Sequence, residues 1–86
     1  MILNVRYRTL KNGRTHRLSE RQTRLLLLLA DGSNHRYTEL QKFLGTKDTR
    51  SVKSVKYNLC NKIPELKIYS NYQQCYRVLN KILITY

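Results

Sequence analysis

The N-terminal part of the chain alternates between apolar and polar positions, a pattern that predicts β-structure. Residues 2–10 are rich in β-branched and aromatic side chains and partly alternate in polarity. The Asn12-Gly13 pair that follows is a strong hairpin signal, because both central residues of such a turn accept positive φ angles. Residues 15–18 are expected to return as the second strand, which gives an N-terminal β-hairpin over residues 1–18.

A leucine-rich segment after the hairpin predicts the first of three helices. Ser19 is suited to cap its N-terminus, and Glu20 places a carboxylate where the helix dipole favours negative charge. The helix is expected to extend to Ala30 and to stop by Gly32. Because leucine occupies every position from 25 to 29, no single face can hold them all, and the helix is expected at the centre of the domain. The main apolar stripe consists of Leu25, Leu26 and Leu29.

A shorter second helix is predicted after a loop at residues 33–36. It starts at Tyr37, ends at Gly45, and has apolar side chains at the i, i+3, i+4 spacing of a buried face. These expected core positions are Leu40, Phe43 and Leu44. His35 in the loop is expected to be a surface residue, as is His16.

The third predicted helix, residues 50–63, has two faces of different chemistry. Asp48 or Thr49 is suited to cap it, and Pro64 ends it because the residue before a proline avoids the helical region. At ~100° per residue, its other apolar side chains fall within about 60° of Val52. These side chains are Val52, Val55, Leu59 and Ile63. The opposite face carries hydrogen-bond donors and no carboxylate, namely Arg50, Lys53, Ser54, Tyr57, Asn58 and Asn61.

Two strand-like runs near the C-terminus predict a second hairpin. They cover residues 66–70 and 73–79. The apolar end of the tail, residues 82–86, is expected to be either a dimer edge or an extra strand of the N-terminal sheet, with the sheet favoured. The order β-β-α-α-α-β-β then predicts one α+β domain over residues 1–86.

The charge composition narrows the choice of partner. The 86 residues include 17 Lys+Arg and 5 Asp+Glu, which gives a formal net charge of +12 and a pI near 10.2. So many positively charged side chains repel one another, and a negatively charged binding partner is expected to offset this repulsion. A pI this far above neutrality in a compact domain favours nucleic acid. An anionic membrane surface and an acidic protein are the alternatives.

The donor-rich face of the third helix favours duplex DNA as that partner. Arginine and lysine reach guanine edges or phosphates, asparagine can pair with adenine, and serine and tyrosine can bond phosphate oxygens. An ordinary solvated helix face is the alternative interpretation. Solvated faces normally mix both signs of charge, because Glu–Lys pairs four residues apart are favourable. Here no carboxylate lies between Asp48 and Glu65.

Other chemistries find little support in the sequence. Cys60 and Cys75 lack closely spaced cysteine or histidine partners, so reduced thiols are expected rather than a disulfide framework or a metal site. With few carboxylates, three glycines and no recognisable catalytic arrangement, we expect no enzyme activity and no cofactor. The longest apolar run, residues 25–30, is too short to span a bilayer, and no signal peptide is visible. A cytoplasmic protein without membrane partners is therefore expected.

Four segments of the chain resemble the winged-helix effector domain of OmpR/PhoB-type response regulators. They are LSERQTRLLLLLA (18–30), YTELQKFLG (37–45), RSVKSVKYNLCNKI (50–63) and KIYSNYQQCYRVL (67–79). In order and spacing they correspond to the family's first helix, positioning helix, recognition helix and wing, and the family also has a β-hairpin ahead of the helices. The resemblance implies a winged helix-turn-helix fold. Its parts are the N-terminal β-hairpin (1–18), the three-helix core (19–63), the C-terminal β-hairpin wing (66–79) and a tail (80–86).

The resemblance also implies a function, that of a stand-alone bacterial or phage transcription regulator without a receiver domain. Such a regulator would bind double-stranded DNA with its recognition helix in the major groove and its wing on the minor groove or backbone. The residues implied as DNA-binding are Arg50, Ser51, Lys53, Ser54, Tyr57, Asn58, Asn61, Tyr72, Gln73 and Arg77. Lys53 stands where the family has an acidic residue, Asn61 replaces a basic one, and larger residues replace the wing glycines. Base preferences therefore do not carry over.

The expected partners include more than DNA. One module of this size buries only about 600–1,000 Å² on DNA, so a homodimer or tandem binding is expected. The alternative hypothesis is a protein-interaction module of the same fold, with RNA polymerase, a host factor or another regulator as its partner. Structured-RNA binding is the third. Arg21 and Arg24, near the start of the first helix, are further candidates for phosphate contacts, with an ordinary solvated surface as the alternative.

Overall fold

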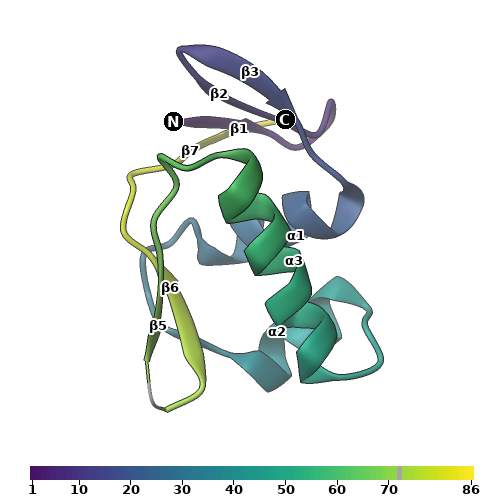
Figure 1. The fold of residues 1–86 in the computed structure, drawn as a ribbon. Coiled ribbons are helices and arrows are strands. Elements are labelled where there is room, and N and C mark those ends of the chain that lie inside the picture. The colour runs from purple at the N-terminus through teal and green to yellow at the C-terminus, as the bar shows by residue number, and fades with distance from the viewer. Residues whose placement is uncertain (72) are drawn as a thin grey trace.

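The protein has an α+β fold in which three helices are flanked by two small sheets (Figure 1). The structure is a computed structural model that describes residues 1–71 and 73–86. Its elements are β1 (Ile2–Asn4), β2 (Thr9–Asn12), β3 (Arg14–Arg17), α1 (Glu20–Leu29), β4 (His35–Arg36), α2 (Tyr37–Leu44), α3 (Thr49–Lys62), β5 (Ile68–Asn71), β6 (Cys75–Val78) and β7 (Leu83–Thr85). The predicted fold class, with an N-terminal hairpin, three helices and a C-terminal hairpin, is confirmed.

The N-terminal sheet has the strand order β3-β2-β1-β7. Strand β7 pairs in parallel with β1, so the C-terminal tail is an extra strand of this sheet, as favoured from the sequence. The predicted single strand over residues 2–10 is wrong, because the chain turns at 5–8 and pairs β1 with β2. The Asn4 side chain promotes this turn by accepting a hydrogen bond from the Tyr7 amide at 2.9 Å.

The second turn of this sheet lies at the predicted Asn-Gly position but is tighter than a two-residue turn. Strands β2 and β3 pair with Asn12 opposite Arg14, which leaves Gly13 alone at the tip. Only Gly13 of the Asn-Gly pair has a positive φ, of 74°. Leu3 and Leu10 face each other across β1 and β2 and are completely buried, so this sheet closes one end of the core.

Helix α1 forms as predicted around a capped N-terminus. The Ser19 hydroxyl accepts from the Gln22 amide at 3.1 Å, and the Gln22 side chain accepts from the Ser19 amide at 2.9 Å. This reciprocal pair satisfies two backbone groups that a helix start leaves open. The predicted stripe of Leu25, Leu26 and Leu29 is completely buried, which places α1 at the centre of the fold.

The segment between α1 and α2 differs from its prediction. The expected loop at 33–36 contains the short strand β4, which pairs with β6. Helix α2 buries Leu40 and Leu44 as expected, and Gly45 ends it with a φ of 72°. Phe43, which was predicted in the core, is instead exposed. The third buried residue of α2 is Tyr37.

Helix α3 and the C-terminal hairpin form the other side of the domain (Figure 1). The Asp48 side chain caps α3 by accepting from the Ser51 amide at 2.9 Å. The predicted apolar face is confirmed, because Val52, Leu59 and Ile63 are completely buried and Val55 is half-buried. The second sheet has the order β4-β6-β5 and buries Tyr76 against the helices.

The lengths and compositions of the helices bear on membrane association. Within residues 1–71 and 73–86, no helix is long and apolar enough to cross a membrane.

Candidate nucleic-acid interface

The outer face of α3 presents the polar side chains that the helical pattern predicted to face outward. Helix α3 directs Val52 and Leu59 into the core, and Ile63 just after the helix is buried as well, so residues on the opposite side of the helix project to solvent. All six predicted donors are exposed: Arg50, Lys53, Ser54, Tyr57, Asn58 and Asn61. We call this set the outer face of α3. The tyrosine hydroxyl end is well separated from the core, since Tyr57 is 65% exposed.

Ser51 has a different position from the other predicted contacts. It is half-buried in the first turn of α3, where its amide and its hydroxyl both donate to Asp48, at 2.9 and 3.1 Å. These hydrogen bonds hold the start of the helix and lower the pKa of the Asp48 carboxyl. The structure therefore gives Ser51 a capping role beside the outer face.

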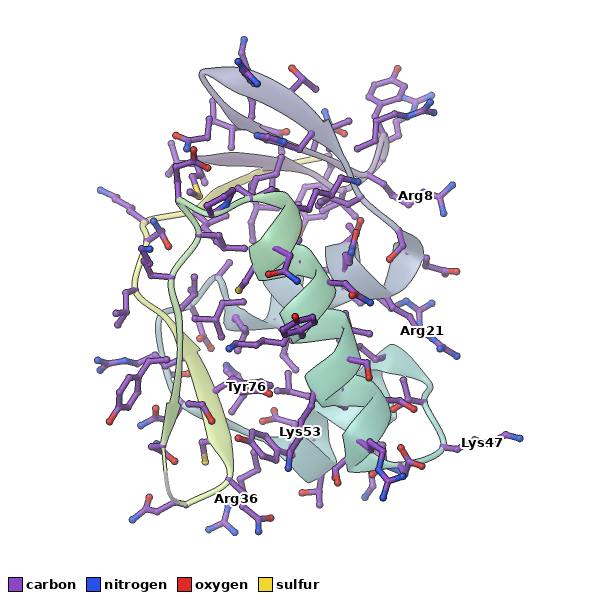
Figure 2. The ribbon with its side chains drawn as sticks, viewed as in Figure 1. Arg8, Arg21, Arg36, Lys47, Lys53 and Tyr76 are labelled. Carbon is purple, nitrogen blue, oxygen red and sulfur yellow. The ribbon has the colours of Figure 1, made fainter. Side chains whose placement is uncertain are left out.

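Two lysines of α3 lie over aromatic rings at the boundary between α3 and the hairpin. The Lys53 Nζ atom is 5.4 Å from the ring centre of Tyr37, and the Lys56 Nζ atom is 5.9 Å from that of Tyr76. The two rings lie 4.6 Å apart in a tilted arrangement. Such contacts stabilise a cation by roughly 0.5–1 kcal/mol at exposed sites. Lys53, labelled with Tyr76 in Figure 2, is thus exposed but oriented toward the hairpin.

The aromatic pair also joins α2 to the hairpin. The Tyr37 hydroxyl and the Ser70 hydroxyl are 2.6 Å apart, and the Tyr37 amide donates to the carbonyl of Gln74 at 2.9 Å. Burial raises the pKa of the Tyr76 hydroxyl well above its ordinary value of 10.0, with a further contribution from Tyr37. These contacts fix the hairpin relative to α3, and neither Tyr37 nor Lys56 was predicted to have this role. The sequence contains one indication of the role of Lys56. It lies three residues after Lys53, so the two side chains lie on adjacent turns of α3.

The tip of the hairpin is organised by the Asn71 side chain, just before the residues that replace the family's wing glycines. The Asn71 side-chain oxygen accepts from the Gln73 amide at 2.9 Å and from the Cys75 amide at 3.3 Å. Gln74 adopts a positive φ of 58°, the conformation that a glycine would take most readily. Gln73, a predicted contact, is exposed at this tip. Tyr72, the other predicted tip contact, lies outside the described residues.

Arg77 is not brought to the same side as the outer face of α3. Residues alternate along a strand, and Tyr76 and Val78 on either side of Arg77 are buried. Arg77 pairs with Tyr69 on the opposite surface of the sheet, and it lines a hollow that also includes residues 30–32 after α1. The structure therefore separates Arg77 from the other predicted contacts.

Two basic residues that the sequence did not single out lie near the outer face of α3. Arg36, in β4, is exposed and lines a small hollow with Gln73 and Gln74 at the hairpin tip. Lys47 is exposed in the turn that leads into α3. Figure 2 shows Arg36 beside the hairpin tip and Lys47 beyond the start of α3, on either side of Lys53. Both lie in short connecting segments, where no periodic pattern indicates which way a side chain points.

The acidic residues are engaged elsewhere in the fold. Glu20 forms an ion pair with Arg24 at 3.1 Å, and Asp48 caps α3. Asp31 and Glu39 each contact His35 at 2.9 Å. The fifth carboxylate, Glu65, follows α3 beyond Pro64. No carboxylate belongs to the outer face of α3, so its positive charge is not cancelled within this face.

His35 is buried, which corrects its expected surface position. Only 7% of the residue is exposed, and the two ring nitrogens lie against Asp31 and Glu39. Burial lowers the pKa of His35, but the hydrogen bonds to Asp31 and Glu39 outweigh it and raise the pKa above 6.5. Two hydrogen bonds lower the pKa of Asp31 to about 2, the larger contribution coming from the Ser33 amide and the smaller from the His35 side chain. This cluster joins the end of α1, β4 and the start of α2.

The thiols and possible metal ligands add no second chemistry to this region. Among residues 1–71 and 73–86, no group of three or more His, Cys, Asp or Glu side chains is arranged so that it could hold a metal ion. Cys60 is half-buried and Cys75 is buried, and both are free. Burial raises the pKa of the Cys60 thiol, which makes it less reactive than an ordinary cysteine.

Comparisons of the sequence with known proteins identify no relative. Neither the protein-family models nor the curated protein sequences include a match to this chain.

Proposed function

We propose that the protein binds double-stranded DNA in a sequence-specific manner, as a transcription regulator of the winged-helix type. The observation that carries the proposal is the outer face of α3, where six exposed donors lie together without a carboxylate. A helix of this kind fits the B-DNA major groove, which is about 12 Å wide. The overall net charge of +12 supports the same polyanionic partner.

Different parts of this surface are suited to different contacts. Asn58 and Asn61 present amides that can pair with adenine, and Arg50 can reach guanine. Lys53 is held over Tyr37, so we assign it a contact with backbone phosphate at the boundary between α3 and the hairpin. Arg36 at the hairpin tip is suited to the same role, because its cation lies next to Gln73.

A single module of this size provides a limited contact area. Specific affinity then requires a second copy, either as a dimer or as neighbouring modules on adjacent sites, as is common for domains that bury only about 600–1,000 Å² on DNA. The regulator role and the oligomeric arrangement both follow from the proposed DNA binding.

Binding-site selection on random duplex DNA tests the proposal. The expected result is an enriched motif, with an affinity for the selected duplex that falls steeply as salt rises, because phosphate contacts release counterions. Repeating the selection with Asn61→Ala should return a motif degenerate at one position, whereas Arg21→Ala should weaken all duplexes alike. If the unmodified protein enriches no motif, sequence-specific binding is wrong.

A further inference from the structure

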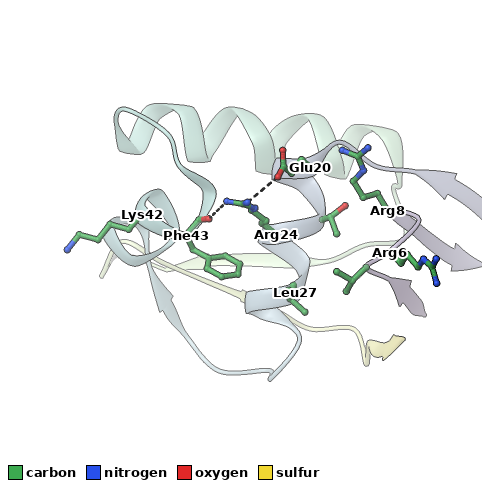
Figure 3. Close-up of a pocket in the computed structure, with 9 residues that line it drawn as sticks. Arg6, Arg8, Glu20, Arg24, Leu27, Lys42 and Phe43 are labelled. Atoms are coloured by element: carbon green, nitrogen blue, oxygen red, sulfur yellow. Dashed lines mark hydrogen bonds and ion pairs between the residues drawn. The ribbon is translucent and has the colours of Figure 1, made fainter. Parts of the chain in front are cut away.

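A second surface of the protein combines an apolar floor with a basic rim (Figure 3). This hollow has a volume of about 730 Å³ and is lined by the turn at residues 5–8, α1 and α2, without any contribution from α3. The apolar part of the lining consists of Val5, Leu27 and Phe43. The basic side chains of interest are Arg6, Arg8 and Lys42. We call this site the flank hollow.

Phe43 gives the flank hollow an apolar surface that the fold leaves open. It is the only phenylalanine of the chain, and the helical pattern predicted it in the core. In the structure it is 38% exposed at the end of α2, with the half-buried side chains of Val5 and Leu27 also in the lining. Covering such surface is favourable by roughly 25 cal/mol per Å². The floor is therefore suited to an apolar side chain from outside the domain.

The single carboxylate in the lining does not neutralise the rim. Glu20 is already paired with Arg24 at 3.1 Å, and the same guanidinium donates to the carbonyl oxygen of Phe43 at 3.2 Å. Figure 3 shows Arg24 held between these two partners. Arg6, Arg8 and Lys42 are exposed and belong to the lining. In Figure 3 they extend outward from its edges, with Lys42 directed away from Leu27, so three cations lie at the edge of the hollow.

The turn that carries two of these cations has a fixed backbone. The Arg8 carbonyl accepts from the Leu18 amide at 2.8 Å, and the Tyr7 amide donates to Asn4 at 2.9 Å. Arg8 has a φ of 52°, which is uncommon for a residue other than glycine. The hydrogen bonds hold this conformation, so the positions from which Arg6 and Arg8 extend are set before any partner binds.

From this combination we propose that the flank hollow binds an acidic segment of a partner protein that carries an aromatic side chain. The aromatic ring would enter the floor against Phe43, and the flanking carboxylates would meet Arg6, Arg8 and Lys42. The positive charge of the rim favours an acidic partner. The apolar floor favours a partner with an apolar side chain over a ligand that offers only phosphate groups. The site shares no residue with the outer face of α3, so it does not depend on the proposed DNA binding.

A peptide titration followed by NMR tests this proposal on the whole chain. The probe is a synthetic twelve-residue peptide of Asp and Glu with one central Phe, added to isotope-labelled protein. The expected amide shifts concentrate at residues 5–8, at Leu27 and at Lys42 and Phe43. Lys42→Glu should weaken binding about fivefold or more through lost charge attraction. A peptide with Ser in place of Phe should bind about tenfold more weakly, because apolar burial is lost.

Two controls separate a specific site from general attraction to a basic protein. Lys81→Glu changes the net charge by the same amount outside the flank hollow and should leave peptide affinity nearly unchanged. Phe43→Ala, checked for folding by its own NMR spectrum, should weaken the Phe peptide and not the Ser peptide. The proposal is overturned by absent binding, by shifts on α3 or spread over all basic surfaces, or by equal losses for Lys42→Glu and Lys81→Glu. It is also overturned if Lys42→Glu weakens duplex DNA and leaves the peptide unaffected.

Discussion

The α1–β4–α2 junction and the outer face of α3 differ in whether their charged side chains have partners within the fold. At the α1–β4–α2 junction, Asp31 and Glu39 enclose His35, and each carboxylate has a ring nitrogen of His35 within 3 Å. On the outer face of α3, Arg50 and Lys53 are exposed, and no carboxylate accompanies them. The carboxylates of the first region are paired within the fold, whereas the second region contains cations without a carboxylate beside them.

The net charge of the chain does not by itself say where on the surface positive side chains lack acidic neighbours. A value of +12 could be spread evenly over the surface. In this fold, Glu20, Asp31 and Glu39 are paired with Arg24 and His35. These pairs use acidic residues away from α3, so none of the three carboxylates offsets the positive charge of Arg50 and Lys53. The same composition without this distribution would give a far weaker prediction of where a polyanion binds.

The largest expected effect separates the two faces of α3. Leu59→Ala should lower the free energy of unfolding by about 2–5 kcal/mol, because Leu59 is completely buried in the core. Asn58→Ala, one position away on the outer face, should change it by less than about 0.5 kcal/mol. Urea unfolding of both variants measures the difference. Equal losses would mean that the outer face of α3 is packed rather than open.

The junction should respond to pH in a way that α3 does not. His35 has a raised pKa in the folded state, so its stabilisation is fully present below pH 6.5 and is lost as the pH rises through the folded-state pKa. His35→Gln should therefore cost roughly 1–3 kcal/mol in mildly acidic buffer and less in alkaline buffer. Urea unfolding from mildly acidic to alkaline pH measures this trend. A loss that is independent of pH would show that His35 acts only by packing.

Glu39→Gln is the matched variant for this cluster. It removes the charge of one His35 partner and keeps Asp31, so its pH-dependent loss should be smaller than that of His35→Gln.

The Asp31 carboxyl, with its pKa lowered from 3.8 to about 2, adds stability that is present above pH 4 and lost toward pH 2.

On the α3 side, base recognition is expected to depend on single amides. Asn61→Ala should reduce discrimination between the selected duplex and a duplex altered at one base pair by about 1–3 kcal/mol. Arg21→Ala should lower affinity for both duplexes equally and reduce the salt slope, as loss of a phosphate contact does. Fluorescence anisotropy at several salt concentrations measures both. Uniform loss for Asn61→Ala would reassign it from base to backbone contact.

The smallest effect is expected for the exposed ion pair of α1. The Glu20 and Arg24 side chains are 65% and 46% exposed, and solvent screens their attraction. Glu20→Gln should therefore change the free energy of unfolding by no more than about 1 kcal/mol. Comparing its urea midpoint with that of Glu39→Gln sharpens the contrast between a screened pair and one against a buried imidazole. A larger loss for Glu20→Gln would reverse that ranking.

The long periodic segments were predictable because burial follows their repeat. The faces of α1 and α3, the Ser19 and Asp48 caps and the extra C-terminal strand all agree with the sequence. The helix faces and the caps depend on residues close together in the chain or on a regular spacing, so local chemistry determines them. For the C-terminal strand only the strand-like composition is local, because its pairing partner β1 lies at the other end of the chain.

The mistakes occurred where tertiary contacts override local patterns. Phe43 fits the apolar spacing of α2, but the helix turns that position toward the flank hollow. His35 lies in a polar segment whose two-residue strand β4 exists only by pairing with β6. For His35 the strand that decides its position is distant in sequence, so a local pattern contains no information about it.

The central claim is that the outer face of α3 is the surface that reads DNA, and NMR shift mapping tests it most directly. Isotope-labelled protein is titrated with the duplex enriched by binding-site selection. We predict the largest amide shifts between Arg50 and Asn61 and at Gln73, with small shifts at β2 and β3. Large shifts confined to the N-terminal sheet or to the flank hollow, with the α3 amides unchanged, would contradict the claim.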